Sequence, residues 1–213
     1  MFAEVLPGNT KAILALLGKN QIIQKAYLAG GTALALQLGH RISYDLDFFT
    51  QEAFDENLLL PEVEEISGFH LERISWRTII GNFKGVKFSI FYYKYPLFYP
   101  FKKFGMINVA DISDVAVMKI TAIACRGTKR DFIDLYFICK EGISLKETLL
   151  LYNRKYKTLT ANLVHIQKSL VYFEDAEEEE MPKMLKKVDW ENVKEFFERE
   201  VKKLAKNNFE NRR

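Results

Sequence analysis

Alternation of apolar and polar residues dominates the first half of the chain. It runs through three segments rich in aromatic residues, and such alternation is typical of strands. The second and third segments flank a glycine-containing turn at 81–85, which predicts a hairpin added to the same sheet as the first segment. The three predicted strand segments are 43–50, 69–80 and 86–98.

Helical spacing of apolar residues takes over from Asp111. Earlier in the chain, a strand over 25–31 lies between two short predicted helices that end at Gly18 and Gly39. The pattern therefore predicts an N-terminal mixed-sheet domain and a C-terminal helical domain, and we read the acidic run 174–180 as a solvated loop. The expected domains are 1–108 and 109–213, and the expected later helices are 111–127, 129–142, 144–156, 160–173 and 189–206, the last capped by Asp189.

Composition indicates a chain with a packed core and gives no sign of a membrane span or a zinc site. The chain has 213 residues, of which 48% are hydrophobic, so it can bury a sizeable core. We find neither a secretory leader nor an apolar run of about 18 residues, and we expect a cytoplasmic protein. The net charge of +3 is too small to indicate a nucleic-acid partner by itself. Cys125 and Cys139 show no zinc spacing and are expected to be reduced core thiols.

Candidate chemistry gathers in residues 27–49. Asp45 and Asp47 are two apart, so on a strand both side chains lie on one face and their charges repel unless a cation compensates. Mg²⁺ suits such a pair of carboxylates. The Gly30–Gly31 turn, followed by Thr32 and a helix, offers backbone N–H groups to phosphate. Together the two halves indicate a nucleoside triphosphate site. Taken separately, the Gly-Gly pair is as easily a simple turn, and the Asp-x-Asp segment is as easily an edge strand with two solvated acids.

These residues resemble a known family. The stretch "LAGGTALALQLGHRISYDLDFF" is similar to the signature of the nucleotidyltransferase superfamily related to DNA polymerase beta. The closer resemblance is to the AbiEii/AbiGii toxin branch, supported by the blocks "DISDVAVMKITAIACRGTKRDFIDLYFI", "VYFEDAEEEEMPKML" and "DWENVKEFF". The resemblance implies an α+β protein with a polymerase-beta-like mixed sheet flanked by helices, followed by a helical domain. It also implies metal-dependent transfer of a nucleoside monophosphate from a nucleoside triphosphate to an acceptor hydroxyl, on the 3′ end of transfer RNA or another RNA or on a protein, with an antitoxin as partner.

The resemblance also assigns roles to individual residues. Asp45 and Asp47 would bind Mg²⁺ or Mn²⁺, and Lys119 would balance charge on the phosphates. Asp131 matches a late acid that would act as base or as an outer metal ligand. The residues expected to contact the triphosphate or the acceptor are Gly30, Gly31, Thr32, Arg41, Ser43, Arg126 and Arg130. For the block around Asp131, a helix start in which Asp134 pairs with Arg130 is the alternative.

One departure from the family pattern bears on activity. Many relatives carry a third carboxylate on a neighbouring strand, where this chain has Ser89, and no acid lies between Glu72 and Asp111. A catalytically silent nucleotide- or partner-binding protein is therefore an alternative, and so is an enzyme that modifies a small molecule such as an aminoglycoside antibiotic. The segment 91–104 interleaves aromatic residues and lysines, which suits either RNA contact or a sheet edge with buried rings.

Overall fold

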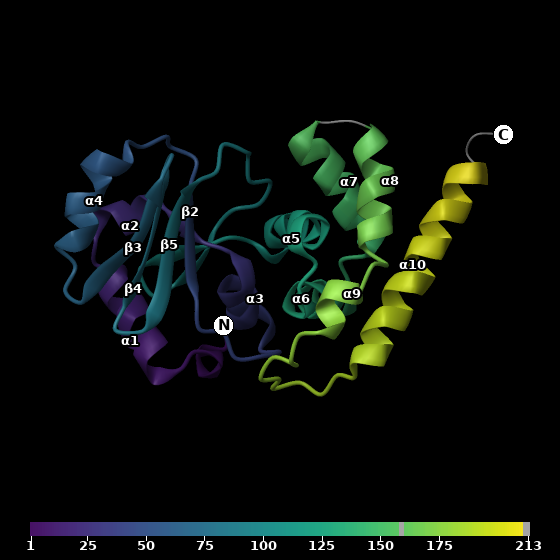
Figure 1. The fold of residues 1–213 in the computed structure, drawn as a ribbon, viewed down its shortest axis with the longest axis horizontal. Coiled ribbons are helices and arrows are strands. Elements are labelled where there is room, and N and C mark those ends of the chain that lie inside the picture. The colour runs from purple at the N-terminus through teal and green to yellow at the C-terminus, as the bar shows by residue number, and fades with distance from the viewer. Residues whose placement is uncertain (158–159, 211–213) are drawn as a thin grey trace. The chain divides into compact units, whose positions relative to one another are not determined.

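The computed structural model describes residues 1–157 and 160–210 (Figure 1). The chain divides into two compact units, Met1–Asp114 and Val115–Arg213. The first unit contains the sheet and the second is helical. The predicted α+β class is confirmed.

The sheet of the first unit is mixed. Among the described residues its seven strands lie in the order β3-β4-β5-β2-β1-β7-β6. Strand β2 runs parallel to β5 and β1 runs parallel to β7, whereas the other neighbours are antiparallel. The strands are β1 (Tyr27–Leu28), β2 (Leu46–Thr50), β3 (Phe69–Ser75), β4 (Thr78–Phe83), β5 (Val86–Tyr92), β6 (Lys102–Phe104) and β7 (Ile107–Val109).

The two faces of the sheet differ in burial. Side chains on one face, such as Leu28, Phe48 and Ile90, are almost completely buried. The helices α1 (Gly8–Leu17) and α3 (Gly30–Leu38) pack against strands β5 and β2. The opposite face carries Asp47 and Phe49, which are only half-buried. The alternation in β2 thus places Leu46 and Phe48 in the core and Asp47 on the other face, as the sequence predicted.

Some short elements of the first unit were not predicted. The strands β6 and β7 have three residues each, too few to show a period. Helix α2 (Gln21–Lys25) is capped by Asn20, whose side-chain oxygen accepts the N–H of Ile22 at 2.9 Å. The other two helical segments of the unit are η1 (Ala3–Val5) and α4 (Glu56–Glu64).

The expected hairpin is in fact a three-stranded meander. Residues 69–80 do not form one strand, because the chain turns at Trp76 and Arg77 between β3 and β4. That turn has neither glycine nor proline, and Arg77 adopts a φ of 48°, which only its surroundings stabilise. Its N–H donates to Glu56 Oε2 at 2.9 Å, and its guanidinium lies 4.7 Å from the centroid of the Tyr92 ring. Since these partners are distant in sequence, the local pattern could not reveal the turn.

The second unit is built around aromatic rings. The Phe132 ring lies within 5.1–5.9 Å of the rings of Phe173, Trp190 and Phe197. Asp189 caps the last helix through the N–H of Glu191 at 3.1 Å, as predicted. The helices are α5 (Ile112–Arg126), α6 (Lys129–Lys140), α7 (Leu145–Tyr156), α8 (Thr160–Ser169), α9 (Glu174–Glu177) and α10 (Trp190–Glu210). Among the described residues, no helix has both the length and the apolar content that a membrane span requires.

Two sequence predictions in this unit are wrong. Cys125 is exposed in the last turn of α5, because helix periodicity brings it to the outer face; it is not a core thiol. The acidic run is also more than a solvated loop. It includes α9, and Glu179 accepts the N–H of Lys129 at 2.9 Å, at the N-terminus of α6. The ammonium of Lys129 donates to the Glu179 carbonyl and lies 5.3 Å from the centroid of the Trp190 ring.

Candidate functional site

The turn between β1 and α3 brings the backbone against an acidic side chain. Gly30, the first residue of α3, has a φ of +65°. A Cβ atom at this position would lie 3.1 Å from Asp47 Oδ2, so only glycine combines this backbone conformation with this approach. The N-cap residue, Ala29, supplies no side-chain acceptor. The N–H groups of the first helical turn, which includes Gly31 and Thr32, therefore lack a side-chain cap and point towards any ligand that lies there.

The acid pair lies beside this turn. Asp45 immediately precedes β2, and Asp47 is its second residue; both are half-buried. Asp47 is opposite Ser89 of β5 in the sheet register, and the Ser89 hydroxyl donates to Asp47 Oδ1 at 2.5 Å. The position that the resemblance indicated for a third carboxylate is thus adjacent to Asp47 and holds a neutral hydroxyl. The Asp47 carboxylate itself lies between the Gly30 turn and Ser89.

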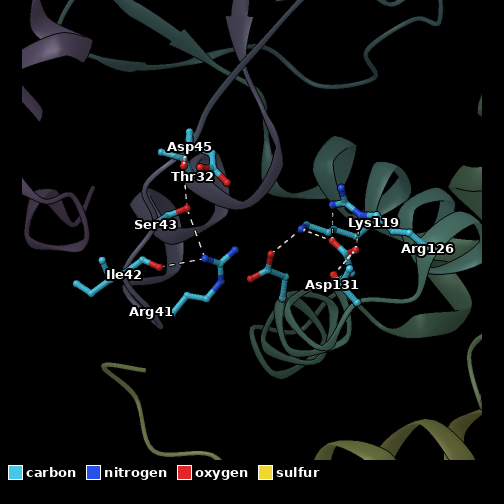
Figure 2. A network of polar contacts seen from close by, with 10 residues as sticks. Thr32, Arg41, Ile42, Ser43, Asp45, Lys119, Arg126 and Asp131 are labelled. Carbon is cyan, nitrogen blue, oxygen red and sulfur yellow. Dashed lines mark hydrogen bonds and ion pairs between the residues drawn. The ribbon is translucent and has the colours of Figure 1, made fainter. Parts of the chain in front are cut away.

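A chain of buried polar groups fixes the start of the acidic strand. The Thr32 hydroxyl donates to the carbonyl oxygen of Asp45 and lies 2.8 Å from Ser43 Oγ (Figure 2). Arg41 Nη1 donates to the carbonyl oxygen of Ile42 at 3.0 Å and to Ser43 Oγ at 3.4 Å. Thr32, Arg41 and Ser43 are all buried. Their side chains tie α3 to the segment before β2 and so set the position of Asp45.

The acid pair has the chemistry of a hard-cation site. Carboxylate oxygens are the ligands that Mg²⁺ and Mn²⁺ prefer, and Mg²⁺ commonly takes only one or two of them from the protein. The described residues contain no group of three or more His, Cys, Asp or Glu side chains placed to hold a metal. A cation at Asp45 and Asp47 would therefore complete its coordination with water and substrate oxygens.

A second polar cluster lies in the helical unit. The Lys119 ammonium of α5 is buried and lies 2.8 Å from Asp131 Oδ1 and 2.6 Å from Asp134 Oδ2 (Figure 2 shows the pair with Asp131). Asp131 also accepts from Arg126 Nε at 2.9 Å and from the Thr128 hydroxyl at 2.7 Å. Burial raises the pKa of Asp131, but the charges and hydrogen bonds of Lys119 and Arg126 outweigh it and lower the pKa from 3.8 to about 2.

The structure thus gathers the predicted residues into one group in each unit. In the first unit, Gly30 lies against Asp47, and Thr32, Ser43 and Arg41 support the segment that carries Asp45. In the second unit, Lys119, Asp131 and Arg126 are in direct contact; the Arg126 side chain is 63% exposed, and Arg130 is exposed on the first turn of α6.

Sequence reasoning missed that Asp134 is a partner of Lys119. Asp131 and Asp134 are three residues apart in a predicted helix and so share a face, and this spacing was the available signal.

Comparison with known proteins gives the family of this chain. The family model described as the nucleotidyl transferase AbiEii toxin of a type IV toxin–antitoxin system matches residues 12–105 and 95–211. The chain belongs to this family. An uncharacterized protein of Aquifex aeolicus (strain VF5) is 44% identical over 186 residues, which cover 85% of this chain and 88% of that protein.

Solved structures of low sequence identity share the fold of this AbiEii family member. A putative nucleotidyltransferase from H. pylori matches with a TM-score of 0.55 and 20% identity, covering 93% of this chain and 96% of that one. MenT4, a nucleotidyltransferase toxin from Mycobacterium tuberculosis H37Rv, matches with a TM-score of 0.52 and 16% identity, covering 92% and 86%. The resemblance to nucleotidyltransferases is therefore shown at the level of both family and fold.

Proposed function

We propose that this AbiEii protein transfers a nucleoside monophosphate from a nucleoside triphosphate to an acceptor hydroxyl. The observation that carries the proposal is the position of the Asp47 carboxylate, which lies against the Gly30 turn on one side and accepts from Ser89 on the other. The backbone N–H groups at the start of α3 bind the phosphates, and the dipole of α3 favours their negative charge. Thr32 contributes its N–H, while its hydroxyl holds Asp45 in place.

A divalent cation held by Asp45 and Asp47 would neutralise the triphosphate and make its α-phosphorus more electrophilic. In the helical unit, Asp131 is a poor proton acceptor at neutral pH, because its pKa is about 2. We assign it, with Lys119, to holding Arg126 in place. Arg126 and Arg130 then offer exposed guanidinium groups to phosphate of the nucleotide or of the acceptor.

Label transfer tests the proposal. Purified protein is incubated with Mg²⁺ or Mn²⁺, each nucleoside triphosphate labelled at the α-phosphate, and total RNA or cell extract. We expect label on RNA or protein with the native chain and none with Asp45→Asn or Asp47→Asn. If no acceptor takes up label from any triphosphate, or if both variants transfer it as well as the native chain, the proposal fails.

A silent binding protein is the second candidate, and Ser89 is the observation that favours it. A serine beside Asp47 cannot supply the negative charge or the proton-accepting oxygen of a third carboxylate. Calorimetry separates the two candidates, because a silent relative binds triphosphate without releasing pyrophosphate.

The proposal also includes a toxin role, which rests on the family to which the chain belongs. Induced expression in a bacterial host should arrest growth with the native chain and not with Asp45→Asn at equal protein level. Co-expression of the neighbouring gene product tests for an antitoxin. Growth arrest that is equal in the native chain and in Asp45→Asn would separate toxicity from the acid pair.

A further inference from the structure

An aromatic surface lies on the same sheet face as the acid pair. It consists of Phe49, Phe91, Tyr93, Tyr95 and Phe101, which are half-buried or exposed rather than sealed in the core. The Phe49 ring lies 5.3 Å from the Phe91 ring and 5.7 Å from the Tyr93 ring, and Tyr93 lies 5.2 Å from Tyr95. Tyr27 connects Phe49 to Phe101 at 6.0 and 5.3 Å. The rings therefore form one continuous set.

The sheet register fixes which face the rings occupy. Asp47 and Phe49 are two apart in β2, so their side chains lie on one face about 7 Å apart along the strand. Phe49 is opposite Phe91, and Asp47 is opposite Ser89. The surface therefore begins one side-chain step beyond the acid pair.

The same register separates two neighbouring lysines. Lys103 of β6 is opposite Asn108 of β7. Asn108 is in turn opposite Tyr27 of β1, and Tyr27 is opposite Phe49 of β2. Lys103 therefore belongs to the face of the acid pair. Lys102 is opposite Val109 and belongs to the other face, where its ammonium lies 3.2 Å from Asp111. Both lysines are exposed. A positive charge thus flanks the rings at Lys103, and Lys102 provides a control of the same residue type.

The connector that carries several of these rings is held in place. The buried Asp114 carboxylate accepts the backbone N–H groups of Phe98 and Tyr99, at 3.0 Å for the closer oxygen in each case. Gln51 Nε2 donates to the Tyr95 carbonyl at 3.0 Å. The exposed Lys94 ammonium lies 5.6 Å from the centroid of the Tyr95 ring. Because this connector is already fixed, it has less conformational entropy to lose when a ligand binds.

In the proposed reaction, the strand order assigns the nucleotide and the acceptor to different sides of the acid pair. Strand β2 lies between β1, which leads into the Gly30 turn, and β5, which carries Ser89. In an in-line displacement the attacking oxygen and the leaving group lie on opposite sides of the phosphorus. With the pyrophosphate at the Gly30 turn, the acceptor hydroxyl lies on the Ser89 side, where Phe91 follows on the same strand and Tyr93 comes directly after that strand.

We propose that the aromatic surface binds the single-stranded end of a nucleic-acid acceptor, with its terminal hydroxyl at Asp47 and the preceding bases stacked on the rings. This inference rests on the proposed function for the direction of the strand. Interleaved rings and cations suit unpaired bases and a phosphate backbone. A duplex keeps its bases stacked on one another, and a folded protein acceptor would not require a row of rings.

Binding of a defined probe tests the inference without catalysis. The probe is a fluorescently labelled single-stranded oligoribonucleotide of mixed sequence, and its duplex with the complementary strand is the comparison; fluorescence anisotropy gives Kd without nucleotide. We expect the single strand to bind more tightly. Phe101→Leu should raise its Kd about fivefold through lost stacking. Lys103→Gln should raise the Kd about threefold at low salt and lower the salt dependence by about one phosphate contact.

Two matched variants serve as controls. Lys102→Gln removes the same charge from the other face and should leave Kd unchanged. Trp76→Leu removes a ring that is 72% exposed and packs on Tyr92, outside the aromatic surface, and should also leave Kd unchanged. Thermal unfolding shows whether each variant is folded; if Phe101→Leu is not, the two lysine variants decide. Equal effects of Lys102→Gln and Lys103→Gln, or equal binding of single strand and duplex, overturn the inference.

Failure of the inference is distinguishable from failure of the proposed function. If the oligonucleotide binds as expected but no label is ever transferred, the surface stands and the catalytic proposal falls. If label transfer occurs and depends on Asp45 while Phe101→Leu and Lys103→Gln leave both Kd and transfer unchanged, the catalytic proposal stands and the aromatic surface is not the acceptor site.

Discussion

At the scale of single residues, Ser89 is the side chain that most affects the chemistry of the acid pair. Its hydroxyl lies 2.5 Å from Asp47 Oδ1, so Ser89→Asp would place a third carboxylate against Asp47. Without metal, we expect a loss of about 3 kcal/mol in the free energy of unfolding, because the half-buried charge of Asp47 gains a like-charged neighbour at the buried position of Ser89. A bound cation stabilises the folded state, so Mg²⁺ or Mn²⁺ should raise the Tm of Ser89→Asp more than that of the native chain.

Ser89→Asn is the control for this prediction. It has nearly the same shape as Ser89→Asp and carries no charge, so divalent cations should change its Tm no more than they change that of the native chain. An equal response of Ser89→Asp and Ser89→Asn to metal would count against a cation site at Asp47.

Asp131 predicts a pH dependence of stability. Its pKa falls from 3.8 to about 2 on folding, so it stabilises the folded state above about pH 4, and this contribution of roughly 2 kcal/mol is lost as the pH falls towards 2. We expect Asp131→Asn to unfold more easily by about 3 kcal/mol at neutral pH, since Lys119 and Arg126 lose a charged partner. Urea titrations at several pH values should also show a flatter acid-side dependence for this variant. A native chain and variant with parallel profiles would contradict the assignment.

The two cysteines should differ in reactivity. Burial, followed by the nearby charges of Glu200 and Glu147, raises the pKa of Cys139 to about 12, whereas Cys125 is exposed. Since the thiolate is the reactive form, we expect a disulfide reagent such as DTNB to modify Cys125 quickly and Cys139 only on unfolding. Cys125→Ser should remove the fast phase, and Cys139→Ser should leave it intact.

At the scale of elements, the turn between β1 and α3 combines backbone strain with a close contact. Gly30→Ala should lose about 1 kcal/mol of stability because alanine disfavours a φ of +65°. The added Cβ would also displace the Asp47 carboxylate, so label transfer and metal-dependent stabilisation should be lost as well.

Gly105→Ala separates strain from contact. Gly105 has a φ of +57°, and a Cβ there would meet nothing within 4 Å. Gly105→Ala should therefore lose about as much stability as Gly30→Ala, while its label transfer stays unchanged. If both glycine variants transfer label like the native chain, the approach of Gly30 to Asp47 is not needed for activity.

At the scale of the whole molecule, each of the two compact units has its own buried core. We expect a destabilising change in one unit to act mainly within that unit. In the full chain, Asp131→Asn should increase amide hydrogen exchange in α5 and α6 while β2 and β5 exchange as in the native protein. Uniform acceleration in both units would show instead that the chain unfolds as a single cooperative body.

Local sequence patterns predicted the class of fold, the helices α5 to α8 and α10 of the second unit, and the acid pair beside a glycine turn. These features depend on local spacing: period two predicts Asp45 and Asp47 on one face, and glycine permits the left-handed backbone at the turn. The helix period likewise marked α5 to α8 and α10, and Asp189 marked the start of the last. The family resemblance rested on the same local motifs.

Features that join residues distant in sequence became visible only in the folded chain. The turn at Trp76 and Arg77 depends on contacts with Glu56 and Tyr92. The buried ammonium of Lys119 forms ion pairs with two acids of the next helix. Pairing across four strands determines that Lys103, and not Lys102, shares a face with Asp47. Such contacts carry no fixed sequence spacing, because their energies arise when separate elements pack together.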